Sequence, residues 1–181
     1  MALTATLYNF DIDLTDHDRG VYESLSLRVA RHPSESEDYL WARVLAYALE
    51  YEKGIAFSPG GLSEPDEPAL SIRDLTGAIR AWIEIGTPDP TRLHRAAKAV
   101  PRVVVYVQKD PAQFLERLKG ARIHQADALE IWSIDRALLG ALSESLERRM
   151  AFSLAVSDRE LFIELGAKSL TGGIKRHRID A

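Results

Sequence analysis

The sequence contains no cysteine, and this absence excludes disulfide bonds, thiolate metal sites and a cysteine nucleophile. It also lacks any apolar run as long as a membrane-spanning helix, and residues 1–10 show no charged leader followed by an apolar signal core. Charge of one sign is not in large excess, because the net charge is only −4. We therefore expect a soluble cytoplasmic protein that binds no membrane and is not a polybasic nucleic-acid binder as a whole.

The familiar local motifs of catalysis are missing as well. There is no G-x-S-x-G nucleophile motif, no Walker-type phosphate loop and no histidine spacing typical of a metal site. What the chain has is 181 residues, of which 46% are hydrophobic, and this is enough for one domain over residues 1–181 with a proper core. No feature indicates an oligomer, so we expect a monomer.

The N-terminal part predicts a hairpin and then a helix. Residues 4–15 alternate between apolar and wetter positions, and Leu25, Leu27 and Val29 alternate again after a turn. Ser34 followed by Glu37 has the spacing of a capping box and predicts a helix that begins there and ends at Gly54.

The rest of the chain mixes helices with strands. Asp89-Pro90 predicts a helix start, and residues 103–107 form the continuous apolar run of a strand covered on both faces. The basic end, Lys175–Arg178, is interpreted as a solvated tail, although it could touch a nucleic-acid backbone. The other expected elements are strands at 55–57, 69–73, 78–85 and 129–134, helices at 111–118 and 135–146, a hairpin over 150–165 and an acidic loop at 58–68. These elements predict an α/β (α+β roll) fold with a mixed β-sheet and flanking helices.

The strand at 78–85 carries a carboxylate where apolar residues are expected. Glu84 lies on the same face as Trp82, opposite the apolar face of this strand. A buried carboxylate requires a cation or a metal. If the hairpin brings Asp74 close to Glu84, Mg²⁺ or Mn²⁺ could relieve their repulsion, with the carbonyl of Ile85 as a third ligand. Alternatively, Glu84 pairs with an arginine and Asp74 forms a turn.

Several short motifs together resemble one known family. They are RHPSE at 31–35, DEP at 66–68, WIEIG at 82–86 with Pro88-Asp89, and Arg92 with Arg95 on the following helix. The chain is similar over its whole length to the YaeQ family, a bacterial group whose fold resembles a compact variant of the PD-(D/E)xK nuclease-like fold. The resemblance implies no established activity.

The PD-(D/E)xK pattern assigns site residues by resemblance. It matches Asp74 to its aspartate and Glu84 to its second acid, but Gly86 stands where the pattern has lysine. The replacement would come from Arg92, Arg95, Lys98 or Lys109, and helical spacing turns Arg92 towards the sheet. Asp66 of the acidic loop and Glu35 near the first helix are further candidate ligands, although a solvated acidic turn is the better explanation of Asp66. Gln108 could line the site with Tyr106, or it could equally be an ordinary polar residue at a strand end.

Two hypotheses follow from these residues. The first is an enzyme that uses Mg²⁺ or Mn²⁺ on nucleic-acid phosphodiesters, with Asp74 and Glu84 on the metal and Arg92 or Arg95 on the phosphate. The second is a non-catalytic module with a nuclease-like scaffold that acts through a nucleic-acid or protein partner. They differ in whether Glu84 faces a second carboxylate or is locked against an arginine.

Overall fold

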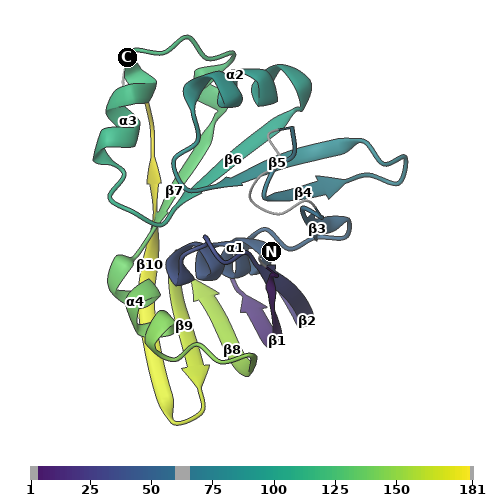
Figure 1. The fold of residues 1–181 in the computed structure, drawn as a ribbon, viewed down its shortest axis with the longest axis vertical. Coiled ribbons are helices and arrows are strands. Elements are labelled where there is room, and N and C mark those ends of the chain that lie inside the picture. Colours follow the sequence, from purple (N-terminus) through teal and green to yellow (C-terminus); the bar gives the residue numbers. More distant parts are fainter. Residues whose placement is uncertain (1–3, 60–65, 180–181) are drawn as a thin grey trace. The chain divides into compact units, whose positions relative to one another are not determined.

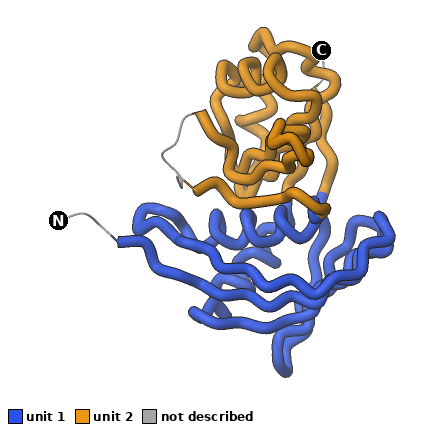
Figure 2. Tube along the Cα trace, turned by 90° about the vertical axis from the view of Figure 1, so that its right-hand side faces the viewer, with its two compact units in different colours: residues 1–51, 134–174 blue, residues 52–133, 175–181 orange. Residues whose placement is uncertain are grey.

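The contacts of the chain fall into two compact units (Figure 2). The computed structural model describes residues 4–59 and 66–179, so the acidic loop predicted at 58–68 lies partly outside the described residues. The first unit comprises residues 1–51 and 134–174, and the second comprises residues 52–133 and 175–181. The predicted mixture of helices with mixed sheets is confirmed in both units.

The first unit contains a mixed sheet with the strand order β2-β1-β8-β9-β10 (Figure 1). Strands β1 and β2 are antiparallel, β1 and β8 are parallel, and β8, β9 and β10 are antiparallel neighbours. The elements of this unit are β1 (Thr6–Asp16), β2 (Val21–Arg31), α1 (Glu37–Leu49), α4 (Arg136–Glu144), β8 (Arg149–Ser157), β9 (Glu160–Leu165) and β10 (Lys168–His177), whose last residues belong to the second unit.

The predicted alternation of the first strand decides which face of this sheet is covered. Phe10 and Ile12 are buried, whereas Asp11 and Asp13 between and beyond them are exposed. The ring of Trp41 on α1 packs edge-on against Phe10 at 5.3 Å between centroids. Helix α1 therefore covers the apolar face, and the acidic face stays in solvent.

In the second unit the strand order is β7-β6-β5-β4-β3. Strands β3, β4 and β5 pair antiparallel, and β5, β6 and β7 pair parallel. Helices α2 and α3 pack on these strands through an apolar core that includes Trp82, Leu93, Val105 and Phe114. The elements are β3 (Ile55–Phe57), β4 (Leu70–Arg73), β5 (Ile79–Ile85), α2 (Pro90–Ala99), β6 (Arg102–Val107), α3 (Ala112–Lys119), the 3₁₀ turn η2 (Ala126–Ala128) and β7 (Glu130–Ile134).

The predicted limits of α1 are wrong at both ends. The hydroxyl of Ser36, rather than Ser34, accepts the backbone N–H of Tyr39 and caps the helix. The helix ends at Leu49, and Gly54 lies in the following turn with φ +101°. A Cβ atom at Gly54 would lie 2.2 Å from the carbonyl oxygen of Arg73, so both the backbone conformation and the space require glycine there.

The basic C-terminal segment is not a solvated tail. It forms β10, which pairs with β9 through residues Lys168 to Gly173. Further along, the side chains of Ser133 and His177 are hydrogen-bonded at 2.7 Å within the second unit. The sequence signal failed because Gly172 and Gly173 interrupt any alternating pattern.

Candidate functional site

Glu84 lies near the end of β5, on the face that packs against α2. Strand β5 exposes almost nothing beyond Arg80, and Glu84 itself is 6% exposed. Its neighbours on this face are the core residues Trp82 on β5 and Val105 on β6, the latter directly opposite Glu84 in the register. The expectation of a buried carboxylate in a sheet strand is therefore confirmed.

Two donors satisfy this carboxylate from within the same unit. Arg92 Nε donates to Glu84 Oε1 at 2.9 Å, and the indole Nε1 of Trp82 donates to the same oxygen at 2.6 Å. The guanidinium of Arg92 also lies 5.6 Å from the Trp82 ring centroid and donates to the main-chain oxygen of Glu67. Burial raises the pKa of Glu84, and the charge of Arg92 and the Trp82 hydrogen bond oppose this rise.

The helix supplies this arginine by a simple local mechanism. The side chain of Asp89 accepts the backbone N–H of Thr91 and caps α2, and Pro90 is its first residue, as predicted. Arg92 is then partly buried beside the sheet, whereas Arg95 and Lys98 are exposed. The prediction that Arg92 turns towards the sheet is confirmed.

Asp74 does not join Glu84, and the expected carboxylate pair is wrong. Asp74 lies in the turn between β4 and β5, where its side chain accepts the backbone N–H and the hydroxyl of Thr76. These two hydrogen bonds lower the pKa of Asp74. Because β5 begins at Ile79 just after this turn, Glu84 lies about 16 Å further along the strand, at roughly 3.3 Å per residue. Asp74 thus has the turn-forming role that was the alternative.

The structure brings the end of the acidic loop into contact with Arg92. Glu67 meets Arg92 through its main-chain oxygen, and its side chain accepts the hydroxyl of Ser58 at 2.7 Å. The neighbouring Asp66 is exposed. The sequence reasoning named Glu67 only as a possible ligand and missed both its main-chain contact with Arg92 and the role of Trp82 as a donor. The alternate spacing that places Trp82 and Glu84 on one strand face was the signal for the role of Trp82 as a donor.

The remaining candidates on this edge of the sheet are spread out. Ile85 is buried, and the backbone N–H of Gly86 donates to the carbonyl of Tyr106. Gln108 is buried, and its Oε1 has no hydrogen-bond partner among the residues described. Within residues 4–59 and 66–179 no group of three or more His, Asp or Glu side chains is arranged to hold a metal ion.

An open cleft of about 740 Å³ lies where β5 and β6 end. Ligands of open α/β sheets commonly bind at this edge. The side chains of Lys109 and Arg117 bring positive charge to the cleft, but Asp110 and Glu116 balance it. Asp110 also accepts the backbone N–H of Ala112 at the start of α3, so one of the N–H groups at this helix end already has an acceptor.

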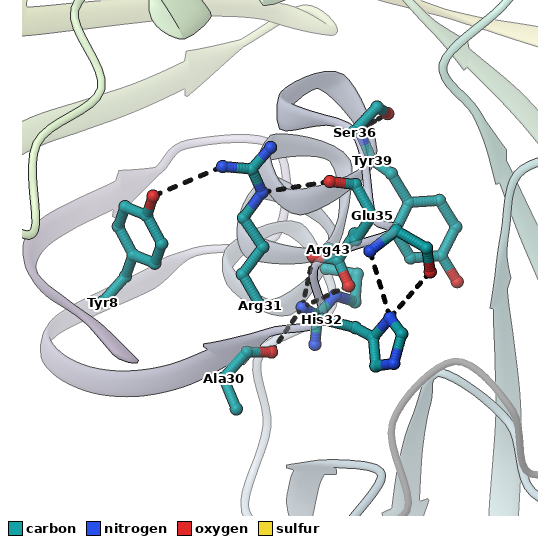
Figure 3. Close-up of polar contacts among 9 residues, drawn as sticks. Tyr8, Ala30, Arg31, His32, Glu35, Ser36, Tyr39 and Arg43 are labelled. Carbon is teal, nitrogen blue, oxygen red and sulfur yellow. Dashed lines mark hydrogen bonds and ion pairs between the residues drawn. The ribbon is translucent and has the colours of Figure 1, made fainter. Parts of the chain in front are cut away.

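Glu35 lies in the first unit and has its own partner (Figure 3). Arg43 Nη2 lies 2.8 and 2.6 Å from the two carboxylate oxygens of Glu35, and both side chains are almost fully buried. Burial raises the pKa of Glu35, and the charge of Arg43 opposes this. Arg31 donates to the main-chain oxygen of Glu35 and to the hydroxyl of Tyr8. The RHPSE segment is thus pinned between β2 and α1.

Comparison with known proteins gives the family. A family model described as YaeQ protein matches residues 1–172. Curated relatives from Salmonella typhi and Escherichia coli K12, both named "Uncharacterized protein YaeQ", are 30% and 29% identical over 164 residues, which is 90% of either chain. No helix in the described part of the chain is long and apolar enough to cross a membrane.

Solved structures agree with this match. The crystal structure of YaeQ protein from Pseudomonas syringae has a TM-score of 0.84 at 30% identity and covers 95% of each chain. That of YaeQ protein from Xanthomonas axonopodis pv. citri has a TM-score of 0.82 at 30% identity, with 98% of this chain and all of the other covered. The chain belongs to the YaeQ family.

Proposed function

We propose that this chain is a non-catalytic binding module, built on a variant of the PD-(D/E)xK nuclease-like scaffold, that acts through a macromolecular partner. One observation carries the proposal: Glu84, the residue matched to the second acid of the pattern, is held by Arg92 and Trp82 of its own unit.

The contacts of Arg92 explain why a metal is not needed there. A guanidinium at 2.9 Å already neutralises Glu84, and an approaching dication would meet its like charge. Displacing Arg92 would also break its contacts with the Trp82 ring and the Glu67 carbonyl. Gly86 provides no side chain at the position of the pattern's lysine. The acidic net charge of −4 favours a protein over a nucleic acid as the partner.

The alternative function is a Mg²⁺- or Mn²⁺-dependent nuclease. The end of the acidic loop favours this function, because it contacts Arg92 and carries a further carboxylate. Asp66 directly precedes Glu67, whose main-chain oxygen contacts Arg92. If Arg92 moved, Glu84, Asp66 and the carbonyl of Ile85 would be the metal ligands in this function, with Arg95 on the phosphate. The two functions therefore differ in whether Mn²⁺ can displace Arg92.

Calorimetric titration with Mn²⁺ tests the proposal on the wild type, Glu84→Gln and Asp74→Asn. The third variant is the matched control, because it removes an exposed carboxylate from the turn of the same hairpin. We expect no saturable binding to the wild type at millimolar Mn²⁺ and no Mn²⁺-dependent cleavage of DNA or RNA. Saturable binding that Glu84→Gln abolishes and Asp74→Asn retains would overturn the proposal in favour of the nuclease.

A further inference from the structure

The outer edge of β2 is the longest unpaired strand edge that the first unit shows. All eleven residues of β2 pair in register with β1, from Thr6 opposite Arg31 to Asp16 opposite Val21. In the strand order of the unit β2 is terminal, and within the described part of the chain no strand pairs with its other side. Such an edge offers a row of N–H and C=O groups to another strand.

The hydrogen bonds of β1 tell which residues of β2 face outward. The N–H of Asn9 donates to the carbonyl of Arg148, so the main-chain groups of Asn9 point towards β8. Its partner on β2, Arg28, therefore directs its own N–H and C=O away from β1. Because this direction alternates along a strand, the outward set consists of Tyr22, Ser24, Ser26, Arg28 and Ala30.

The contacts of Arg43 support this assignment (Figure 3). Arg43 Nη2 donates to the main-chain oxygen of Ala30 at 2.9 Å, and Glu35 neutralises its charge. The outward groups from Tyr22 to Arg28 have no such partner among the described residues. This stretch also contains no proline, no lysine and no bulge, which are the usual protections of a sheet edge.

The side chains of β2 complement a second, antiparallel copy of the same strand. With Leu27 on the two-fold axis, Leu25 lies opposite Val29 of the second copy, and Leu27 lies opposite its own equivalent. Glu23 then lies opposite Arg31 of the second copy, whose guanidinium also donates to the Glu35 main-chain oxygen and the Tyr8 hydroxyl of its own chain, so opposite charges face each other at both ends. On the other face the short side chains of Ser24 and Ala30 oppose one another, and the carbonyl of Ala30 would accept from both Arg43 of its own chain and the N–H of Ser24 of the second copy through its two lone pairs.

Two neighbouring registers of this strand pairing also keep the same faces together, but they place less compatible side chains opposite one another. An axis at Ser26 places Glu23 opposite Val29, and an axis at Leu25 places Glu23 opposite Leu27. Either would set a carboxylate against an apolar residue. We propose that this chain forms a two-fold symmetric dimer by antiparallel pairing of β2 with β2 of a second copy, with Leu27 at the axis. The composition and motifs of the sequence alone predict a monomer. The inferred dimer is independent of the proposed function.

Sedimentation of the intact chain tests whether the dimer exists. The wild type is expected to sediment as a concentration-dependent dimer. Ser26→Pro should give a monomer, because it removes one outward N–H but no hydrogen bond to β1. Ser26→Ala is the matched control: it loses the same hydroxyl contact with Asp11 but keeps the N–H, and should remain a dimer. A wild type that stays monomeric at high micromolar concentration would overturn the proposal.

Disulfide formation tests the register, since the natural chain has no cysteine. Residues facing each other in the non-hydrogen-bonded positions of an antiparallel pair have Cα atoms about 4.5 Å apart, within the range of a disulfide. Leu27→Cys should therefore cross-link on oxidation. Leu25→Cys is equally buried, but its two thiols would be separated by about four residues, or roughly 13 Å, and should stay free. Cross-linking of Leu25→Cys alone would refute this register.

Discussion

Replacing Arg92 by methionine would remove the cation that holds the buried carboxylate of Glu84. Methionine keeps much of the apolar stem, so the losses are the 2.9 Å bond to Glu84, the hydrogen bond to the Glu67 main-chain oxygen and the contact at 5.6 Å with the Trp82 ring. A hydrogen bond between charged groups contributes about 1.5–3 kcal/mol, and a cation–π contact contributes about 0.5–1 kcal/mol. The Glu84 bond and the ring contact together should lower the free energy of unfolding at pH 8 by about 2–4 kcal/mol, and the lost bond to Glu67 adds to this.

The effect of this substitution should depend on pH. Burial raises the pKa of Glu84, and Arg92 opposes that rise, so the pKa rises further in Arg92→Met. The folded variant then binds the proton of Glu84 more tightly than the unfolded chain does. Its loss of stability is therefore small below about pH 4, grows as the pH rises through the ordinary glutamate range, and is complete above the folded-state pKa of Glu84.

Urea unfolding, followed by tryptophan fluorescence at pH 5 and pH 8, measures this difference. Arg95→Met is the matched control, because Arg95 is exposed on the same helix, and it should change stability by no more than about 0.5 kcal/mol. The reasoning would be refuted by an equal loss at both pH values, or by a loss in Arg95→Met as large as in Arg92→Met.

Three further substitutions and one control variant, Gly173→Ala, test other contacts through thermal or urea unfolding. Arg43→Met should cost about 3–5 kcal/mol, because it leaves Glu35 charged and buried without its cation; a cost below 1 kcal/mol would mean that the pair is not buried. Ser36→Ala should cost about 1 kcal/mol through loss of the helix cap. Gly172→Ala should cost about 1–3 kcal/mol, because the new Cβ atom would lie 2.7 Å from the Cβ atom of Leu138 on α4. Gly173→Ala is the control and should be nearly neutral, because its new Cβ atom would crowd only the flexible end of the Glu160 side chain.

Sequence patterns predicted the elements whose signals are local. Asp89 before Pro90 placed the start of α2 correctly, and Asp135 caps α4 at the position expected for that helix. The continuous apolar run of β6 indicated a strand buried on both faces, and every residue of Val103–Val107 is buried. Helical spacing on α2 even selected Arg92 as the basic residue that turns towards the sheet. Each of these features depends on neighbours within a few residues.

The predictions from sequence failed where contacts between residues far apart in the chain determine the local structure. Ser34 and Ser36 both suit a helix cap, and Ser36 is the one used because Arg31 and Arg43 hold Glu35 before the first turn. The pairing of Asp74 with Glu84 failed because Asp74 lies in the turn before β5, whereas Glu84 lies near the far end of that strand, about 16 Å away at roughly 3.3 Å per residue. Strand β10 was missed because Gly172 packs closely against Leu138 of α4, a contact that no local pattern reveals.

The interleaved course of the chain has a consequence for how the protein folds. Strand β1 forms parallel pairs with β8, such as Asn9 with Arg149, so the two partners are about 140 residues apart. Closing so long a loop costs entropy before any contact repays it, and such topologies fold slowly. During synthesis the hairpin of β1 and β2 must wait while the whole segment 52–133 is made. We therefore expect the second unit to acquire its structure first, and a chaperone that shields the waiting hairpin would raise the yield of folded protein.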